Sequence, residues 1–170
     1  MLFRSRSDEI EVGREVLDDA LTRGPAGHYQ SYVAEQDGRA AGWVCFGPAP
    51  CTLGSFEVYW IVVAPAFQRR SLGRRLMEQV ERCIAYRRGR QILIETSGRS
   101  VYESTRAFYA SLGYQPAARL ADFYAPGDDM VVFSKSFASP APPPAPAPAP
   151  SRSSLDLLPR PAAQPLPATS

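Results

Sequence analysis

The stretch from Phe56 to Val63 constrains the fold of this chain more than any other segment. It reads Phe-Glu-Val-Tyr-Trp-Ile-Val-Val, a nearly unbroken apolar run rich in β-branched and aromatic residues. Such runs are typical of strands buried on both faces near the centre of a sheet. Pro65 closes the strand, and a helix follows that Gly89 should end. One face of this helix is apolar: Leu72, Leu76, Val80, Cys83 and Ile84.

The segments around this unit predict the rest of an α/β domain with a mixed sheet. A first helix capped by Ser7 or Asp8 should end before Gly24-Pro25, with Ile10, Val12, Val16, Leu17, Ala20 and Leu21 on its apolar positions. Asp37-Gly38 between two apolar runs is typical of an antiparallel hairpin. The other expected elements are strands over 29–35, 41–46 and 91–95, a helix over 102–112, and a final hairpin of 115–124 and 130–137.

The composition changes sharply after Phe137. Residues 139–170 hold eleven of the seventeen prolines, mixed with alanine and serine, so they have little apolar surface to bury. We therefore predict one domain over 1–137 and a disordered Pro/Ala-rich tail over 138–170. The apolar patch 155–158 in this tail is interpreted as an incidental cluster in preference to a docking motif.

Composition also excludes several classes of function. The three cysteines form no C-x-x-C pair, which argues against zinc or dithiol chemistry, and no metal is expected. No apolar stretch has membrane-spanning length, and the first residues lack the apolar core of a signal peptide, so we expect a cytoplasmic protein. The net charge is only +2, yet eight of the nineteen basic residues fall between Arg69 and Arg90. This concentration indicates a local site for an anionic ligand.

The turn from Gln68 to Gly73 lies where such a ligand would bind. A helix N-terminus leaves backbone N–H groups unpaired and carries partial positive charge, which suits phosphate oxygens. Gly73 lets the backbone approach a ligand closely, and Arg69, Arg70, Arg74 and Arg75 add charge. The turn matches neither the nucleotide P-loop pattern nor the Rossmann pattern, so ATP and NAD are disfavoured.

Two motifs resemble those of the GNAT N-acetyltransferase superfamily. Val63-Ala64-Pro65 followed by Gln68-Arg69-Arg70-Ser71-Leu72-Gly73 is similar to the family's Gln/Arg-x-x-Gly-x-Gly/Ala motif, with Ser71 where the first glycine usually stands. Thr105–Tyr114 resembles the family's late helix, which ends in Phe-Tyr, three residues, Gly and Phe or Tyr. The similarity extends from about Tyr29 to Phe137 and includes the turn 124–129, which looks like one bacterial branch.

The resemblance implies a single GNAT-like domain with a splay between the family's fourth and fifth strands. The N-terminal element would be shortened, because only the stretch before His28 is available for a first strand and helices. The implied reaction transfers an acetyl group from acetyl-CoA to a primary amine, which attacks the thioester directly in a ternary complex. The pantetheine arm would pair with the backbone near Ile61, Val62 and Val63, and residues 68–74 would bind the diphosphate.

The catalytic residues are open to more than one interpretation. Tyr109 matches the family position that protonates the departing CoA thiolate, although it could simply be a core aromatic residue. Glu57 lies in the apolar central strand, where loss of water would make it a stronger base. Its alternative role is a structural carboxylate beside an arginine. Glu95, at the carboxyl end of the next strand, is the competing base, or else a solvated charge.

Other residues are assigned weaker roles or none. The lone His28 is interpreted as structural, and Tyr102 stands where many relatives carry a CoA-contacting asparagine. The aromatic and acidic residues of the last hairpin could line the acceptor side or form an ordinary exposed turn, which is favoured for Asp128 and Asp129. A non-catalytic acyl-CoA-binding regulatory module is the alternative function. No nucleic-acid or membrane partner is expected. The amine acceptor, a small molecule or a peptide, is undetermined, and a homodimer is left open.

Overall fold

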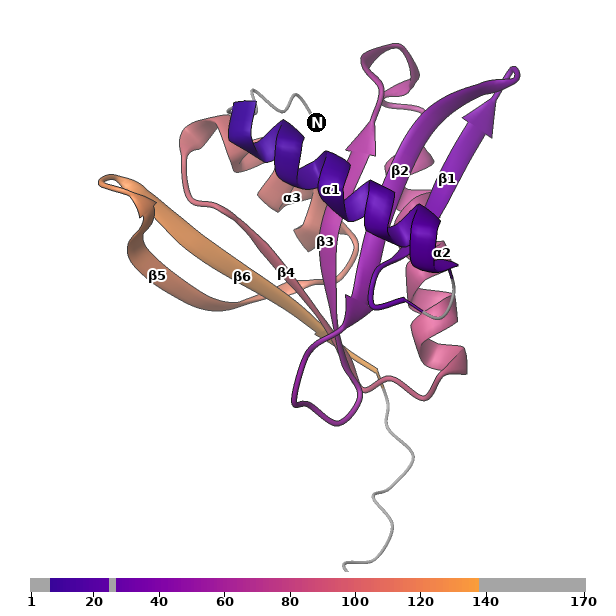
Figure 1. Cartoon of the computed structure of the whole chain (residues 1–170). Helices are drawn as coiled ribbons and strands as arrows, with labels where there is room; N and C mark the ends of the chain where they lie inside the picture. The colour runs from indigo at the N-terminus through magenta and orange to yellow at the C-terminus, as the bar shows by residue number, and fades with distance from the viewer. Residues whose placement is uncertain (1–6, 25–26, 138–170) are drawn as a thin grey trace, which may run out of the picture. The chain divides into compact units, whose positions relative to one another are not determined.

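The computed structural model describes residues 7–24 and 27–137, which form one α/β unit. The predicted tail over 138–170 lies outside the described residues. Six strands make one sheet in the order β1-β2-β3-β4-β6-β5 (Figure 1). Their bounds are β1 (Gln30–Gln36), β2 (Arg39–Pro48), β3 (Ser55–Val63), β4 (Gln91–Ser97), β5 (Gln115–Ala125) and β6 (Asp128–Ser136). The predicted mixed sheet is confirmed, with β3 and β4 parallel and the other neighbours antiparallel.

Three helices cover the sheet, with α1 (Ser7–Arg23) in front and α2 (Leu72–Tyr86) and α3 (Glu103–Ser111) behind in Figure 1. Short 3-10 turns, η2 (Pro65–Phe67) and η3 (Ser100–Tyr102), precede α2 and α3. The main core lies between the sheet and the two rear helices, where Phe46, Val80 and Ile94 are almost fully buried. Helix α1 packs over the opposite face, with Gly13 against the Trp60 ring.

The predicted apolar face of α1 is only partly buried. Val16 and Ala20 are inside, but Ile10, Val12 and Leu21 are at least half exposed. A helix that covers one face of a sheet needs only a narrow apolar stripe, so apolar residues outside it remain in water. The helical spacing of these apolar positions therefore does not bury all of them.

Strand β3 is the centre of the fold, as predicted, but it is not buried on both faces. Glu57, Tyr59, Trp60 and Val62 are partly exposed. A β-bulge explains this pattern of exposure along the strand. Cys45 pairs with Trp60 while Phe46 pairs with Val58, which leaves Tyr59 as the extra residue. The buried positions accordingly change from 56 and 58 before the bulge to 61 and 63 after it.

The two parallel strands separate at this bulge. Strand β3 pairs with β4 only from Ser55 to Val58, opposite Gln91 to Ile94. Beyond Val58 the last residues of β3 have no ladder partner on the β4 side, while β2 continues to pair on the other. The predicted splay between these strands is confirmed, and it leaves backbone groups of β3 available to a ligand.

The ends of the central elements agree with the sequence in most places. Asp37 and Gly38 both have left-handed φ angles, of 53° and 69°, as the predicted hairpin turn requires. Helix α2 ends at Tyr86, earlier than the predicted stop at Gly89, and Arg88 takes the left-handed position with φ of 58°. The Gly89 amide then donates to the Ile84 carbonyl at 2.8 Å. An arginine therefore occupies the closing position where glycine is the usual residue.

Candidate active site

The basic turn stands at the start of a helix, as the sequence predicts. Helix α2 begins at Leu72, and Ser71 precedes it with φ of 60°. The Arg75 amide donates to the Ser71 carbonyl at 3.0 Å. The amides of Leu72, Gly73 and Arg74 lie in the first turn, where a helix offers no carbonyl to accept their hydrogen bonds. These amides are oriented to bind an anion.

Two contacts attach this turn, one to the end of β3 and one to η2. The Gln68 side-chain amide donates to the Val63 carbonyl at 2.9 Å. The Arg70 guanidinium lies over the Phe67 ring, 5.8 Å from its centroid. The Ala64 amide donates to the Ala41 carbonyl of β2 at 2.9 Å, so the backbone groups of Val62, two residues earlier, also face β2. The groups of Ile61 and Val63 face the splay, and because the Val63 carbonyl already accepts from Gln68, the Ile61 groups and the Val63 amide are best placed to pair with a ligand there.

A pocket of about 300 Å³ opens beside this turn. We call it the turn pocket. It is formed by the end of β3, the turn, the start of α2 and one side of α3. Its lining residues are Ile61, Val63, Phe67, Gln68, Arg69, Ser71, Leu72, Gly73, Arg74, Ser104, Thr105 and Phe108. The structure therefore brings together most of the residues predicted to bind the cofactor, while Val62, Arg70 and Arg75 do not line this pocket.

Sequence reasoning missed the α3 side of the turn pocket. Ser104, Thr105 and Phe108 recur at helical spacing and face it from one side of the helix. A Cβ added at Gly73 would lie 3.2 Å from the Phe108 ring, so glycine permits close approach of α2 to α3 as well as to a ligand. The available signal was the helical spacing of these three residues, two of which, Thr105 and Phe108, belong to the late motif.

Tyr109 lies next to this wall but points into the core. It is only 3% exposed, and its ring contacts those of Phe108, Tyr114 and Phe133. Burial raises its pKa well above the ordinary range, so the phenol stays protonated. A protonated phenol beside the pocket can donate a hydrogen bond, and the same surroundings suit a core aromatic residue.

The two candidate bases lie on adjacent strands at the splay. Glu57 on β3 aligns with Leu93, two residues before Glu95 on β4. Glu95 is exposed overall, yet loss of water around its carboxyl group and the negative charge of Glu57 raise its pKa. Because that exposure lets solvent screen the repulsion, we regard the two carboxylates as neighbours whose charges interact weakly.

Three aromatic rings meet at Tyr59. His28 Nε2 and the Tyr59 hydroxyl are hydrogen-bonded at 2.8 Å, and Tyr29 makes edge contacts with both rings. The nearby negative charge of Glu57 contributes to raising the Tyr59 pKa. We call His28, Tyr29, Glu57, Tyr59 and Glu95 the carboxylate cluster. No local pattern indicates a role for His28, because its partner is 31 residues away in the chain.

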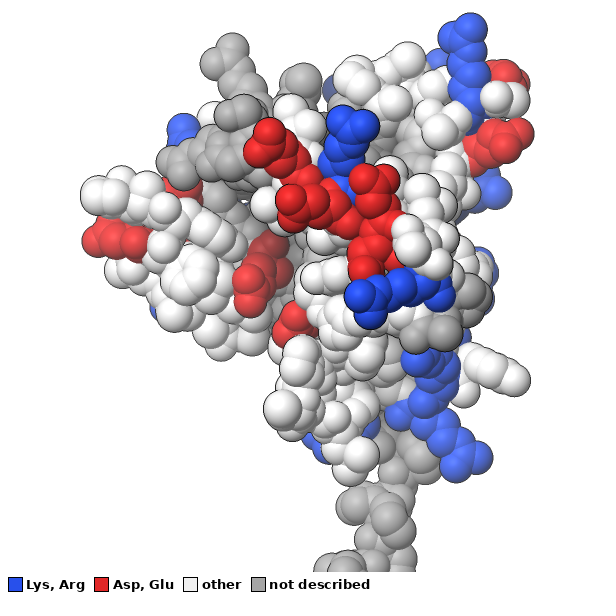
Figure 2. Space-filling view, in the orientation of Figure 1, with Lys and Arg blue, Asp and Glu red and all other residues white. Residues whose placement is uncertain are grey.

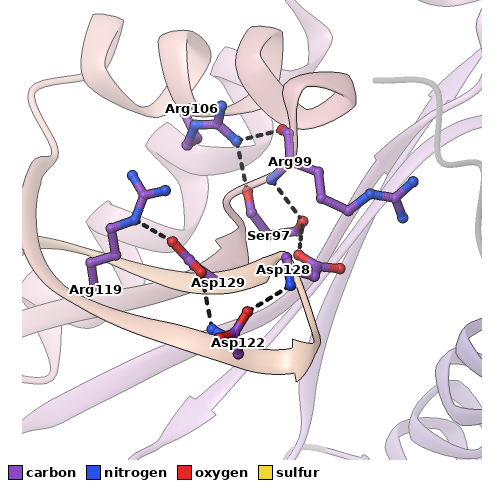
Figure 3. A network of polar contacts seen from close by, with 8 residues as sticks. Ser97, Arg99, Arg106, Arg119, Asp122, Asp128 and Asp129 are labelled. Atoms are coloured by element: carbon purple, nitrogen blue, oxygen red, sulfur yellow. Dashed lines mark hydrogen bonds and ion pairs between the residues drawn. The ribbon is translucent and has the colours of Figure 1, made fainter.

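The last hairpin is fixed to the end of β4 by a polar network (Figure 3). The Ser97 hydroxyl and the buried Asp128 carboxylate form a hydrogen bond of 2.5 Å, and Asp129 pairs with Arg119 at 2.6 Å. Arg106 of α3 donates to the Ser97 carbonyl at 2.7 Å. The expectation of exposed turn charges is wrong for Asp128, because the tight turn places it against β4.

Charge differs between helix α1 and the turn pocket. Figure 2 shows acidic side chains gathered over α1, where Glu11, Glu15 and Asp18 are exposed. The turn pocket instead includes the arginines Arg69 and Arg74.

No helix in residues 7–24 and 27–137 is long and apolar enough to cross a membrane. The same described residues contain no group of three or more His, Cys, Asp or Glu side chains that could hold a metal ion.

Comparison with known proteins agrees with this geometry. Residues 27–116 match the acetyltransferase (GNAT) domain family. An acetyltransferase of the GNAT family from Desulfovibrio desulfuricans is 36% identical, with a TM-score of 0.76 over 79% of this chain and 84% of that one.

More distant structures share the fold. An aminoglycoside 6'-N-acetyltransferase complexed with coenzyme A is 18% identical, with a TM-score of 0.62 over 79% of this chain and 83% of that one. The ribosomal-protein-S18-alanine N-acetyltransferase from Escherichia coli is also 18% identical, with a TM-score of 0.59 over 79% and 93%. No curated protein matches the sequence. The chain belongs to the GNAT acetyltransferase family and is an acyl-CoA-dependent N-acyltransferase.

Proposed function

We propose that the protein transfers the acetyl group of acetyl-CoA to a primary amine, which attacks the thioester directly in a ternary complex. The observation that carries the proposal is the joining of the turn pocket to the splay of β3 and β4, with carboxylates at that splay. An anion on the α2 amides and a chain along β3 would place a thioester beside the amine's proton acceptor.

The turn pocket would hold the CoA diphosphate. The first-turn amides of α2 supply fixed donors, and the exposed Arg69 and Arg74 supply charge. The Ile61 groups and the Val63 amide would pair with the pantetheine arm in place of the missing β4 ladder. Glu57 or Glu95 would then accept a proton from the acceptor ammonium, because only the neutral amine can attack the thioester.

Tyr109 would act at the other end of the reaction. As the carbon–sulfur bond breaks, the phenol would donate its proton toward the departing thiolate. Its raised pKa keeps the proton in place until that charge develops, and makes hydrogen bonding to the thiolate the larger part of its contribution.

The test is thiol release from acetyl-CoA with a panel of mono- and polyamines, amino acids, aminoglycosides and peptides, with mass detection of the products. Calorimetry with CoA measures binding separately. We expect saturable CoA binding and at least one acetylated amine. Saturable binding without thiol release on any amine would contradict the proposed transfer.

Tyr109→Phe tests the acid role in the same assay. We expect a loss in kcat of about tenfold or more with little change in acetyl-CoA affinity, since the ring contacts are kept. Unchanged kcat would leave Tyr109 as a core residue.

A further inference from the structure

The carboxylate cluster links the splay to the surface through neighbouring polar side chains. Glu57 is partly buried on β3, Tyr59 is partly buried at the bulge, and His28 is exposed in the loop before β1. The Tyr59 hydroxyl is hydrogen-bonded to His28 Nε2 at 2.8 Å, and Glu57 lies close enough for its negative charge to raise the Tyr59 pKa. The path therefore ends at its most exposed member, the imidazole.

The fold holds this path in place at two points. Glu57 and Tyr59 are two residues apart on β3, so ordinary alternation along the strand places both side chains on the same face. Gly47 on β2 packs against the other end, where an added Cβ would overlap the His28 carbonyl and lie 3.2 Å from the Tyr59 ring. A side chain at this position would push His28 and Tyr59 apart.

Transfer to an ammonium acceptor creates a need for such a path. Acetyl-CoA and an ammonium ion yield an amide, a free thiol and one proton. The ammonium loses two protons in the process, of which one is equivalent to the proton that ends on the CoA sulfur. The other must leave the splay in every turnover before the base can act again.

We propose that Tyr59 and His28 form a proton relay that carries this proton from Glu57 to solvent. The inference rests on the proposed acetyl transfer and assigns the base role to Glu57. It also gives a function to His28, which the sequence left without one.

The relay step balances within these three groups. Glu57, once protonated by the ammonium, donates its proton to the Tyr59 oxygen while Tyr59 gives its own proton to the neutral His28 Nε2. Glu57 is then a carboxylate again, Tyr59 remains a phenol, and His28 is an imidazolium that loses a proton to water. After the transfer, the hydroxyl hydrogen of Tyr59 points toward Glu57. In this arrangement the N–H of His28 Nε2 donates a hydrogen bond to the Tyr59 oxygen.

The surroundings favour a neutral phenol as the middle member. The titratable groups around Tyr59 are Glu57 on the same strand, Tyr29 in the preceding loop and Cys45 on β2, with Glu95 on β4 beyond Glu57. Burial and the negative charge of Glu57 raise the Tyr59 pKa. Tyr59 therefore passes a proton on without resting as a phenolate.

The test compares His28→Gln and Tyr59→Phe with the wild-type enzyme, using the best amine from the panel. We expect kcat to fall about tenfold in both variants, with the acetyl-CoA KM unchanged. Tyr86→Phe, at an exposed tyrosine at the end of α2, is the matched control and should leave kcat unchanged.

Chemical rescue separates a relay from a structural role. Added imidazole should restore part of the kcat of His28→Ala, because the site is exposed, and should do nothing for Tyr59→Phe. An unchanged kcat in His28→Gln, or a lack of rescue, would overturn the relay. An inactive wild-type enzyme would instead refute the proposed transfer itself, so the two failures are distinguishable.

Discussion

The turn pocket and the carboxylate cluster adjoin the same strand but are built differently. Nine of the residues lining the turn pocket come from the continuous stretch 61–74, where strand, turn and helix follow directly. The carboxylate cluster collects residues from the loop before β1, from β3 and from β4. Backbone amides dominate the first region, and titratable side chains dominate the second. The comparison teaches that binding and proton transfer can be changed separately in this fold.

Glu57→Gln should produce the largest effect, and this effect should be on kcat and not on CoA binding. Removal of a general base lowers kcat by about a hundredfold or more, whereas the turn pocket is untouched. Steady-state kinetics and calorimetry with CoA measure the two effects. Glu35→Gln, on the exposed surface of β1, is the matched control. Equal turnover of Glu57→Gln and wild type would move the base role to Glu95.

Arg74→Gln should give the opposite pattern, with weaker acetyl-CoA binding and little change in kcat. The Arg74 side chain lines the turn pocket, and loss of a charged contact to phosphate should weaken affinity by about three- to tenfold at low salt. Arg75→Gln is the matched control, because Arg75 is the next residue in the chain and does not line the pocket. Equal losses in both variants would mean that only the overall positive charge matters.

Ser71→Gly should sharpen the comparison through a gain in stability at the turn pocket. Ser71 holds a left-handed conformation with φ of 60°, which costs a non-glycine residue about 1–2 kcal/mol. Glycine would remove this cost and so stabilise the folded protein. Part of that gain is offset by the greater freedom of glycine in the unfolded chain, so the net stabilisation should be below about 1 kcal/mol. Urea unfolding measures it. A less stable variant would show that the serine side chain makes a contact of its own.

Glu95→Gln should have the smallest effect, visible as a pH dependence of stability. The folded-state pKa of Glu95 is raised by loss of water and then by the charge of Glu57, so ionisation opposes folding. The wild type therefore loses stability as pH rises through that pKa, while glutamine does not. The variant should be more stable at pH 7, by under about 1 kcal/mol because solvent screens the exposed group, and equal to the wild type below about pH 4. A difference that is the same at both pH values would contradict this cause.

The differences between expectation and structure have specific physical reasons. The α2 start and the Asp37-Gly38 turn could be predicted, because each depends on residues within a few positions. The bulge at Tyr59 could not, since it is a property of the register with β2. Asp128 was expected in an exposed turn, but its burial depends on Ser97 at the end of another strand.

By itself, the sequence determined the order of the elements, the central strand and the position of the basic turn at a helix start. These follow from side-chain periodicity, turn chemistry and the unpaired amides of a helix, all of which are local. Tertiary structure alone decided that α3 completes the turn pocket and that His28 meets Tyr59 beside Glu57. The reason is that strand register and packing set the distances between residues remote in the chain, and hydrogen bonds depend on those distances to within a few tenths of an ångström.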